Sequence, residues 1–276
     1  MHRFILLLFS LFYFLSISTA QLADSIYFAS RQRMLKLLYV QLQETDGPEK
    51  QQAELVFRDS LFQVVSSPGS EQFNFDSLPF IGRIASIDKK LIIYSWNIPQ
   101  PEGYHHYFCI AQYYLKEEKR YKSTLFIEEP GFINKSPQGQ ATSLFWPGAL
   151  YYEIVSTRYK GKEYFTLLGY DFNHLLSNRK LIEVLGFSVE GLPFFEPKAI
   201  FYDGKPHNRL IFEYNERAQM MLRYSKADRM IVFDHLSPAK LSLEGQFQFY
   251  GPDLSFDGLV FEEGIWKHKT DILPTF

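Results

Sequence analysis

The stretch from residue 209 to residue 238 contains three apolar runs separated by two short polar breaks, and no helix-length repeat runs through it. An alternation with a period of two residues is typical of strands, so this stretch predicts a three-stranded antiparallel meander. The shortest turns that the spacing allows are centred on Glu216 and Arg217 and on Lys226 and Ala227.

These turns assign each residue of the meander to one of two faces. One face carries Leu210, Phe212, Tyr214, Met221, Arg223, Met230, Val232 and Asp234. The other face carries Ile211, Glu213, Met220, Leu222, Tyr224, Ile231, Phe233 and His235. Both faces are mostly apolar, so we expect this sheet to be covered on both sides and to form part of the core.

The chain beyond Phe73 continues as short apolar strands joined by short polar turns. Aromatic residues make up 17% of the chain, and aromatic side chains favour pleated, packed strands over helices. The sequence therefore predicts a mainly β protein with antiparallel up-and-down sheets, arranged as a sandwich or as propeller-like blades. The predicted turn sequences are Asp88-Lys89-Lys90, Lys160-Gly161-Lys162, Asp203-Gly204, Asp257-Gly258 and Glu263-Gly264.

Residues 24–65 have a helical period instead. The predicted apolar stripes are Ile26, Met34, Leu38 and Leu42, and then Ala53, Phe57, Leu61 and Val65. Between the stripes, Pro48 suits the first turn of a helix and Glu49 is favourable near its N-terminus. We expect an α-helical hairpin at residues 21–70 and an antiparallel β domain at residues 71–276, with a linker rich in Ser, Pro and Gly at residues 66–70.

The first 20 residues have the features of a signal peptide. His2 and Arg3 precede an apolar run at residues 4–17, and small residues at Ser18 and Ala20 predict cleavage before Gln21. The run is shorter than the roughly 20 residues that span a bilayer, which makes a membrane anchor the weaker alternative. We expect an exported protein, periplasmic or extracellular, that is not an integral membrane protein. We also expect no lipid anchor, because the residue directly after the cleavage site is Gln21 and not a cysteine.

The net charge is -2, which gives no basic field for nucleic-acid binding. Cys109 is the single cysteine, so no intrachain disulfide can form, and its apolar neighbours indicate a small buried residue and not a nucleophile. The sequence contains no HExxH zinc motif, no CxxC pair and no glycine-rich phosphate loop. We therefore expect no cofactor.

Two polar groupings near the C-terminus are candidates for a site. Asp253, Ser255 and Asp257 stand at alternate positions before a glycine, as at the start of a calcium loop, but Gly264 occupies the position where a bidentate glutamate is expected. Asp234 and His235 have the chemistry of an acid and its imidazole. On one strand they point to opposite faces, so they act together only if the strand ends between them.

Two further interpretations involve glycans. Trp266, with the other tryptophans, could stack on a sugar ring, although a role in the core is favoured. A carboxylate-dependent glycan hydrolase would draw its acids from Glu128, Asp171, Asp234 and Asp253. We expect the chain to act by binding or as a structural component and not as an enzyme, with an envelope protein or a glycan as its partner, and the hydrolase is the alternative.

Several segments resemble a family of exported bacterial proteins of unknown function. The resemblance lies in FDSLPFIGRIASIDKKLIIYSWNIP at 75–99, WPGALYYEIV at 146–155, KEYFTLLGYDFN at 162–173 with SNRKLIEVLGF at 177–187, RLIFEYN at 209–215, RMIVFDHLSP at 229–238 and FYGPDLSFDGLVFEEGIW at 249–266. It implies a location in the bacterial cell envelope, and it implies no catalytic residue, substrate or cofactor.

Overall fold

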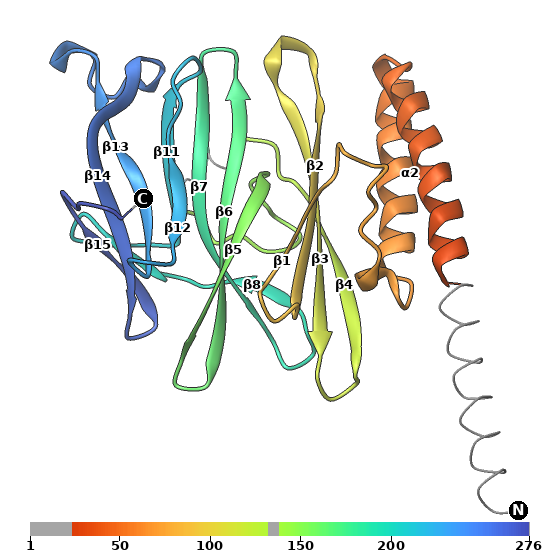
Figure 1. Cartoon of the computed structure of the whole chain (residues 1–276). Helices are drawn as coiled ribbons and strands as arrows, with labels where there is room; N and C mark the ends of the chain where they lie inside the picture. Colours follow the sequence, from red (N-terminus) through yellow and green to blue (C-terminus); the bar gives the residue numbers. More distant parts are fainter. Residues whose placement is uncertain (1–23, 132–137, 276) are drawn as a thin grey trace, which may run out of the picture. The chain divides into compact units, whose positions relative to one another are not determined.

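The computed structural model of the chain describes residues 24–131 and 138–275 (Figure 1). The predicted signal peptide therefore lies outside the described residues. The chain divides into two compact units, one that ends at Phe80 and one that begins at Ile81. The first unit is helical, and the second is mainly β, with three short 3-10 helices among its described residues.

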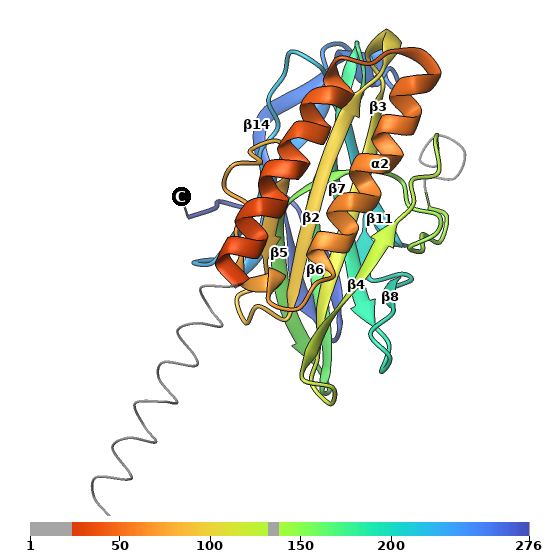
Figure 2. The same cartoon turned by 90° about the vertical axis from the view of Figure 1, so that its right-hand side faces the viewer.

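The first unit contains the predicted helical hairpin. Its first helix covers residues 24–43 and its second, α2, covers Gly47–Val65. Figure 2 shows the two helices side by side and antiparallel. Asp46 is the N-cap of α2, Pro48 lies in its first turn beside Glu49, and a short 3-10 helix, η1 (Ser70–Gln72), follows. The break before Pro48 and the stop after Val65 are thus where the sequence predicts them.

The predicted apolar stripe of the first helix is wrong at Ile26, whereas Leu42 is buried and Met34 and Leu38 are half-buried. Ile26 is 61% exposed, and the buried apolar residues of the first helix recur every seven residues. The buried face of the first helix is therefore rotated by part of a helical turn from the predicted stripe. The buried apolar residues are Phe28, Leu35 and Leu42 in the first helix and Phe57, Leu61, Val64 and Val65 in α2.

The second unit contains three β-sheets. The first sheet has the order β1-β2-β3-β4, with β1 (Gly82–Ala85), β2 (Leu91–Pro99), β3 (His105–Leu115) and β4 (Arg120–Phe126). The middle sheet has the order β11-β7-β6-β5, with β5 (Leu150–Tyr159), β6 (Lys162–His174), β7 (Ser177–Phe187) and β11 (Arg209–Asn215), and β8 (Pro193–Phe195) also pairs with β7.

The last sheet has the order β10-β9-β15-β14-β13-β12. Its neighbours are antiparallel except β15 and β9, which are parallel. Its strands are β9 (Ile200–Tyr202), β10 (Lys205–His207), β12 (Leu222–Ser225), β13 (Met230–Pro238), β14 (Tyr250–Glu262) and β15 (Ile265–Lys269). The 3-10 helices of this unit are η2 (Pro101–Gly103), η3 (Leu241–Leu243) and η4 (Phe247–Phe249).

The sheets stack as three layers, with the middle sheet between the other two (Figure 1). One core contains residues of the first and middle sheets, such as Ile93 of β2 and Leu181 of β7. A second core contains residues of the middle and last sheets, such as Ile182 of β7 and Ile231 of β13. Because both faces of the middle sheet are covered, its strands are apolar on both faces. The fold is mainly β, antiparallel and sandwich-like, as the sequence predicts.

The predicted meander does not form as one sheet. β11 pairs with β7 in the middle sheet, whereas β12 and β13 form a hairpin in the last sheet. The hairpin pairs Leu222 with Phe233, which confirms the predicted face, but its connection has four residues, since Ser225 pairs with Met230. The chain between β11 and β12 crosses from one layer to the next, because this lets Phe212 pack on Phe233 across the second core.

One predicted turn is also absent. Gly258 pairs with Lys269 inside β14, so Asp257 and Gly258 continue a strand. The turn at Lys160 and Gly161 has a positive φ at both residues, 47° and 81°. This is the backbone of the two-residue hairpin turn that twists with its strands.

Candidate functional site

A cluster of acidic and imidazole side chains forms where β13 meets β14. The pairing of the two strands shifts between Asp234 and Leu236, so His235 lies in an irregularity of β13. His235 Nδ1 lies 2.9 Å from Asp257 Oδ2, and His235 Nε2 lies 4.0 Å from Asp253 Oδ2. The structure thus brings together three of the candidate residues, His235, Asp253 and Asp257. The irregularity in β13 positions His235, and the sequence does not predict it.

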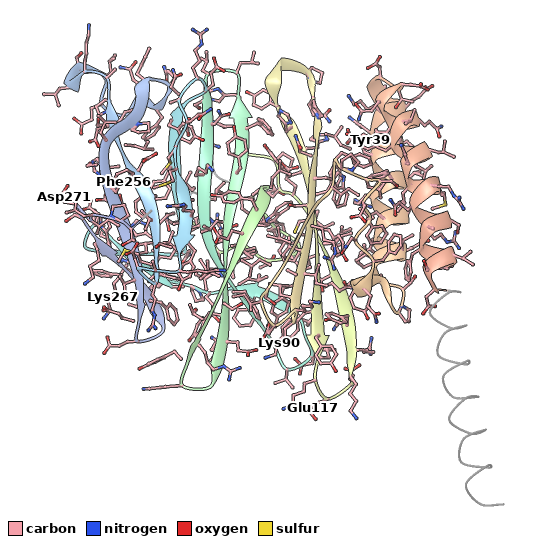
Figure 3. The ribbon with its side chains drawn as sticks, in the orientation of Figure 1. Tyr39, Lys90, Glu117, Phe256, Lys267 and Asp271 are labelled. Carbon is pink, nitrogen blue, oxygen red and sulfur yellow. The ribbon has the colours of Figure 1, made fainter. Side chains whose placement is uncertain are left out.

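Asp257 is the buried member of this cluster. It is 2% exposed, and its Oδ1 accepts a hydrogen bond of 3.1 Å from the backbone N–H of Asp271. His268 Nε2 lies 3.3 Å from Asp257 Oδ2, so a second imidazole is within ion-pair distance of this oxygen, although of the two only His235 hydrogen-bonds to it. Figure 3 labels Asp271 and its neighbour Phe256 on this side of the last sheet.

The electrostatics favour a charged His235. The hydrogen bond with Asp257 raises the pKa of His235, and partial burial opposes this effect. Partial burial works to raise the pKa of Asp253, but hydrogen bonds from Ser255 outweigh it and leave the pKa lowered. The His235 side chain is 46% exposed. An imidazole held by a buried carboxylate and open to solvent on its other side can exchange protons or bind an acidic group.

The other two candidates, Asp234 and Trp266, form hydrogen bonds with residues outside this cluster. Asp234 Oδ2 accepts a hydrogen bond of 2.6 Å from the backbone N–H of Met221, and burial raises the pKa of Asp234. Trp266 is fully buried in the second core, and its Nε1 donates to Thr166 Oγ1 at 2.8 Å. Asp234 therefore fixes the start of β12, and Trp266 presents no ring face to a sugar.

The remaining carboxylates of the hydrolase alternative are bound to Tyr107. Glu128 Oε2 accepts the backbone N–H of Tyr107 at 2.7 Å, and Asp171 Oδ1 accepts its hydroxyl at 2.9 Å. Asp171 also lies 3.6 Å from Arg179, and burial raises the pKa of Asp171. The contact of Asp171 ties β3 to β6, and the contact of Glu128 ties the segment after β4 to β3, so both carboxylates hold parts of the β unit together.

Other chemistries find little support among the described residues. No group of three or more His, Cys, Asp or Glu side chains in residues 24–131 and 138–275 could hold a metal ion. Cys109 is buried, and burial raises the pKa of its thiol well above the usual value. In the same part of the chain, no helix combines the length and apolar character needed to cross a bilayer.

A groove that the sequence does not predict lies beside β11. It has a volume of about 520 Å³ and mixes aromatic, charged and amide side chains. Its walls come from four separate stretches of the chain, so no local sequence motif predicts it. The groove is lined by Gln138, Arg179, Tyr202, His207, Arg209, Leu210, Ile211, Phe212, Glu213 and Phe247.

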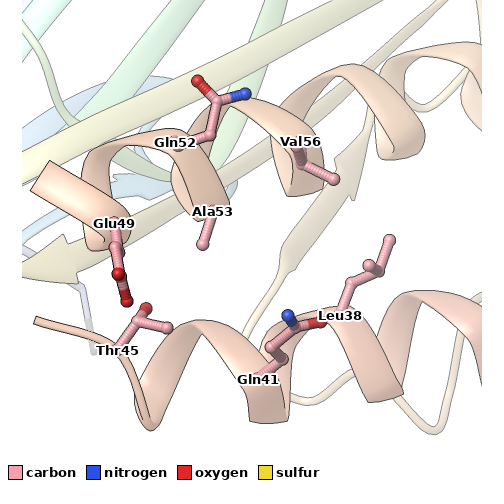
Figure 4. A pocket seen from close by; sticks show the side chains of 7 residues that line it. All are labelled: Leu38, Gln41, Thr45, Glu49, Gln52, Ala53 and Val56. Atoms are coloured by element: carbon pink, nitrogen blue, oxygen red, sulfur yellow. The ribbon is translucent and has the colours of Figure 1, made fainter.

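Two other hollows have simpler linings. In the helical unit, side chains of the first helix, including Leu38 and Gln41, face Ala53 and Val56 of α2 across a space of about 260 Å³ (Figure 4). At the turns of the β unit, a hollow of about 490 Å³ lies among charged residues that include Lys90 and Glu117, both labelled in Figure 3.

Comparison with models of known protein families, with curated proteins and with solved structures gives no match.

Proposed function

We propose that the chain is an exported protein that acts by binding and that its ligand occupies the groove beside β11. The observation that carries this proposal is the groove itself, which combines the volume of a ligand site with aromatic faces and a few convergent polar groups. Tyr202, Phe212 and Phe247 supply the aromatic faces. Gln138 supplies an amide group and His207 an imidazole.

The charges of the groove are balanced by pairing. Arg179 Nε donates to Glu213 Oε2 at 2.8 Å, and Arg209 Nε donates to Glu183 Oε1 at 3.0 Å. A groove whose cations are already paired favours a ligand that offers hydrogen bonds over one that offers net charge. Both partner classes expected from the sequence, an envelope protein and a glycan, meet this condition.

Export is the second part of the proposal. It is supported by the signal-peptide features of residues 1–20. When the full chain is expressed in a bacterium, we expect the mature protein to appear outside the cytoplasm with Gln21 as its first residue. N-terminal sequencing of the purified protein tests this, and a protein that retains Met1 in the cytoplasm would refute export.

Binding can be tested with one substitution in the groove and one beside it. Phe247 lines the groove and is 44% exposed, whereas Leu241 is 89% exposed on the same connection and does not line it. We expect Phe247→Asp to lower binding at least about tenfold in glycan arrays or in pull-downs from envelope extracts, and Leu241→Asp to leave it unchanged. Equal binding by both variants, or no binding by the native protein, would refute a ligand site in the groove.

Glycan hydrolysis remains the second candidate function, because Asp253 and Asp257 both approach His235. In that case Asp253→Asn would abolish the release of reducing sugar from envelope polysaccharides, while Asp234→Asn would leave it intact. Native protein that releases no sugar from any such polysaccharide would remove this candidate.

A further inference from the structure

β11 is the outermost strand of the middle sheet. It pairs along its whole length with β7, from Arg209 opposite Glu183 to Asn215 opposite Ser177, and with no other strand of the described chain. An edge strand presents a row of backbone N–H and C=O groups on its open side, and these groups can pair with another chain. The open side of β11 borders the groove.

The side chain of Gln138 shows which backbone groups face outwards. Its Nε2 donates to the carbonyl oxygen of Arg209 at 3.1 Å, and its Oε1 accepts the backbone N–H of Asn208 at 3.0 Å. The Arg209 carbonyl therefore points away from β7. In an antiparallel pair, every second residue directs its backbone groups to the same side, so Ile211 and Glu213 also direct theirs outwards.

The same edge of β7 is covered further along. β8 continues this edge, with Phe195 opposite Leu185, and a bridge joins Thr142 to Phe194 on its outer side. Gln140 Nε2 donates to the Phe195 carbonyl at 2.5 Å. The segment from Thr142 back to Gln138 thus pairs with the edge by backbone and amide groups, and among the described residues this cover reaches as far as Arg209.

Beyond Arg209, no described residue pairs with the outward backbone groups of Ile211 and Glu213. His207 Nδ1 is also buried without a hydrogen-bond partner among the described residues. Polar groups in a groove need partners or water. The stretch from Arg209 to Glu213 offers backbone N–H and C=O groups to a partner at the spacing of a strand, about 3.4 Å per residue.

We infer that the groove takes an extended polypeptide segment of a partner protein, which adds as a strand beside β11. This inference rests on the proposed function and names the partner class. The amide group of Gln138 has the donor and acceptor of a peptide bond, and it already occupies the first position of the row. A peptide backbone continues this pattern with its two-residue period, while its alternate side chains enter the pockets on either side. The paired charges of the lining suit an uncharged backbone.

The decisive substitution is Ile211→Pro. It removes an N–H that points away from β7, so the pairing of β11 with β7 is kept, and proline is tolerated at such edge positions. Ile211→Val is the matched control, because it keeps the N–H and most of the side chain. Unfolding temperatures of both variants, compared with the native protein, show whether the fold survives.

The probe is a phage-displayed library of linear dodecapeptides, selected against the native protein. We expect the selected peptides, made synthetically, to bind Ile211→Pro at least about tenfold more weakly than the native protein or Ile211→Val. Peptides N-methylated at successive positions give a second readout that does not depend on the fold of a variant. Methylation should weaken binding at every second residue only, as strand pairing requires.

The inference is overturned if the peptides bind Ile211→Pro as well as the native protein, or if N-methylation has no two-residue period. It is also overturned if light scattering shows a dimer that Ile211→Pro abolishes, because the occupant would then be a second copy of this chain. Loss of envelope or glycan binding in Phe247→Asp, with Ile211→Pro unaffected, would keep the proposed function and reject strand addition.

Discussion

The buried ion pair of Glu183 and Arg209 allows a quantitative test of the middle sheet. Both side chains are 1% exposed, and their atoms lie 3.0 Å apart on neighbouring strands. Glu183 Oε2 also accepts the hydroxyl of Tyr151 at 2.6 Å, and Arg209 Nη2 donates to the carbonyl of Gly139 at 3.1 Å. Glu183→Leu therefore leaves a buried guanidinium without its carboxylate and a buried hydroxyl without its acceptor.

We expect Glu183→Leu to lower the free energy of unfolding by about 3–5 kcal/mol, the usual cost of breaking a buried pair. In a domain of this size, that corresponds to a fall in Tm of roughly 6–20 °C. Adding Arg209→Met removes the unpaired charge and should restore at least about 2 kcal/mol. Recovery stays incomplete by about 1–3 kcal/mol, because Tyr151 still lacks its acceptor.

Urea denaturation followed by tryptophan fluorescence measures these changes, since Trp96, Trp146 and Trp266 are all buried. The matched control is Glu216→Leu, which breaks an exposed pair with Arg217 and should cost less than about 1 kcal/mol. A single Glu183→Leu variant as stable as this control, or a double variant less stable than the single one, would refute the assigned role of the pair.

Three further outcomes follow from the structure. Asp257→Asn should lower the pKa of His235, measured by NMR titration, because the hydrogen bond that His235 donates to Asp257 is the main cause that raises it. An unchanged pKa of His235 in the variant would contradict the role of this hydrogen bond. In the native protein, His235 contributes its full stabilisation below its unfolded pKa of about 6.5, and this stabilisation is lost as the pH rises through the pKa of the folded state. Trp266→Phe should cost about 1–3 kcal/mol in urea denaturation, and Thr166→Val in the same chain should reduce that loss, since the pair shares one buried hydrogen bond. Gly264→Ala should lower Tm more than Gly161→Ala, because both glycines have a positive φ but only Gly264 would place a Cβ 2.8 Å from Tyr159. An equal fall in Tm for the two variants would show that the contact with Tyr159 adds no cost to the backbone strain.

The candidate site shows where sequence-based prediction succeeds and where it stops. Residue type and spacing single out Asp253, Asp257 and His235, and the structure brings them together. His268 was missed because its contact with Asp257 depends on the pairing of β14 with β15. The groove was missed because its lining residues come from distant stretches that only the stacking of layers brings together.

The sequence by itself determined the elements of this protein. The helical hairpin with its break at Pro48, most strands and the turns at Lys160, Asp203 and Glu263 follow from local periodicity and turn chemistry. These features depend on residues within a few positions of one another.

The tertiary structure alone decided which strands share a sheet. Local pattern could not separate β11 from β12 and β13, because a strand that is apolar on both faces fits a meander and a stacked layer equally well. Burial of Phe212 against Phe233 across two layers favours the second arrangement. The open edge of β11, and with it the proposed binding groove, is a consequence of that long-range packing.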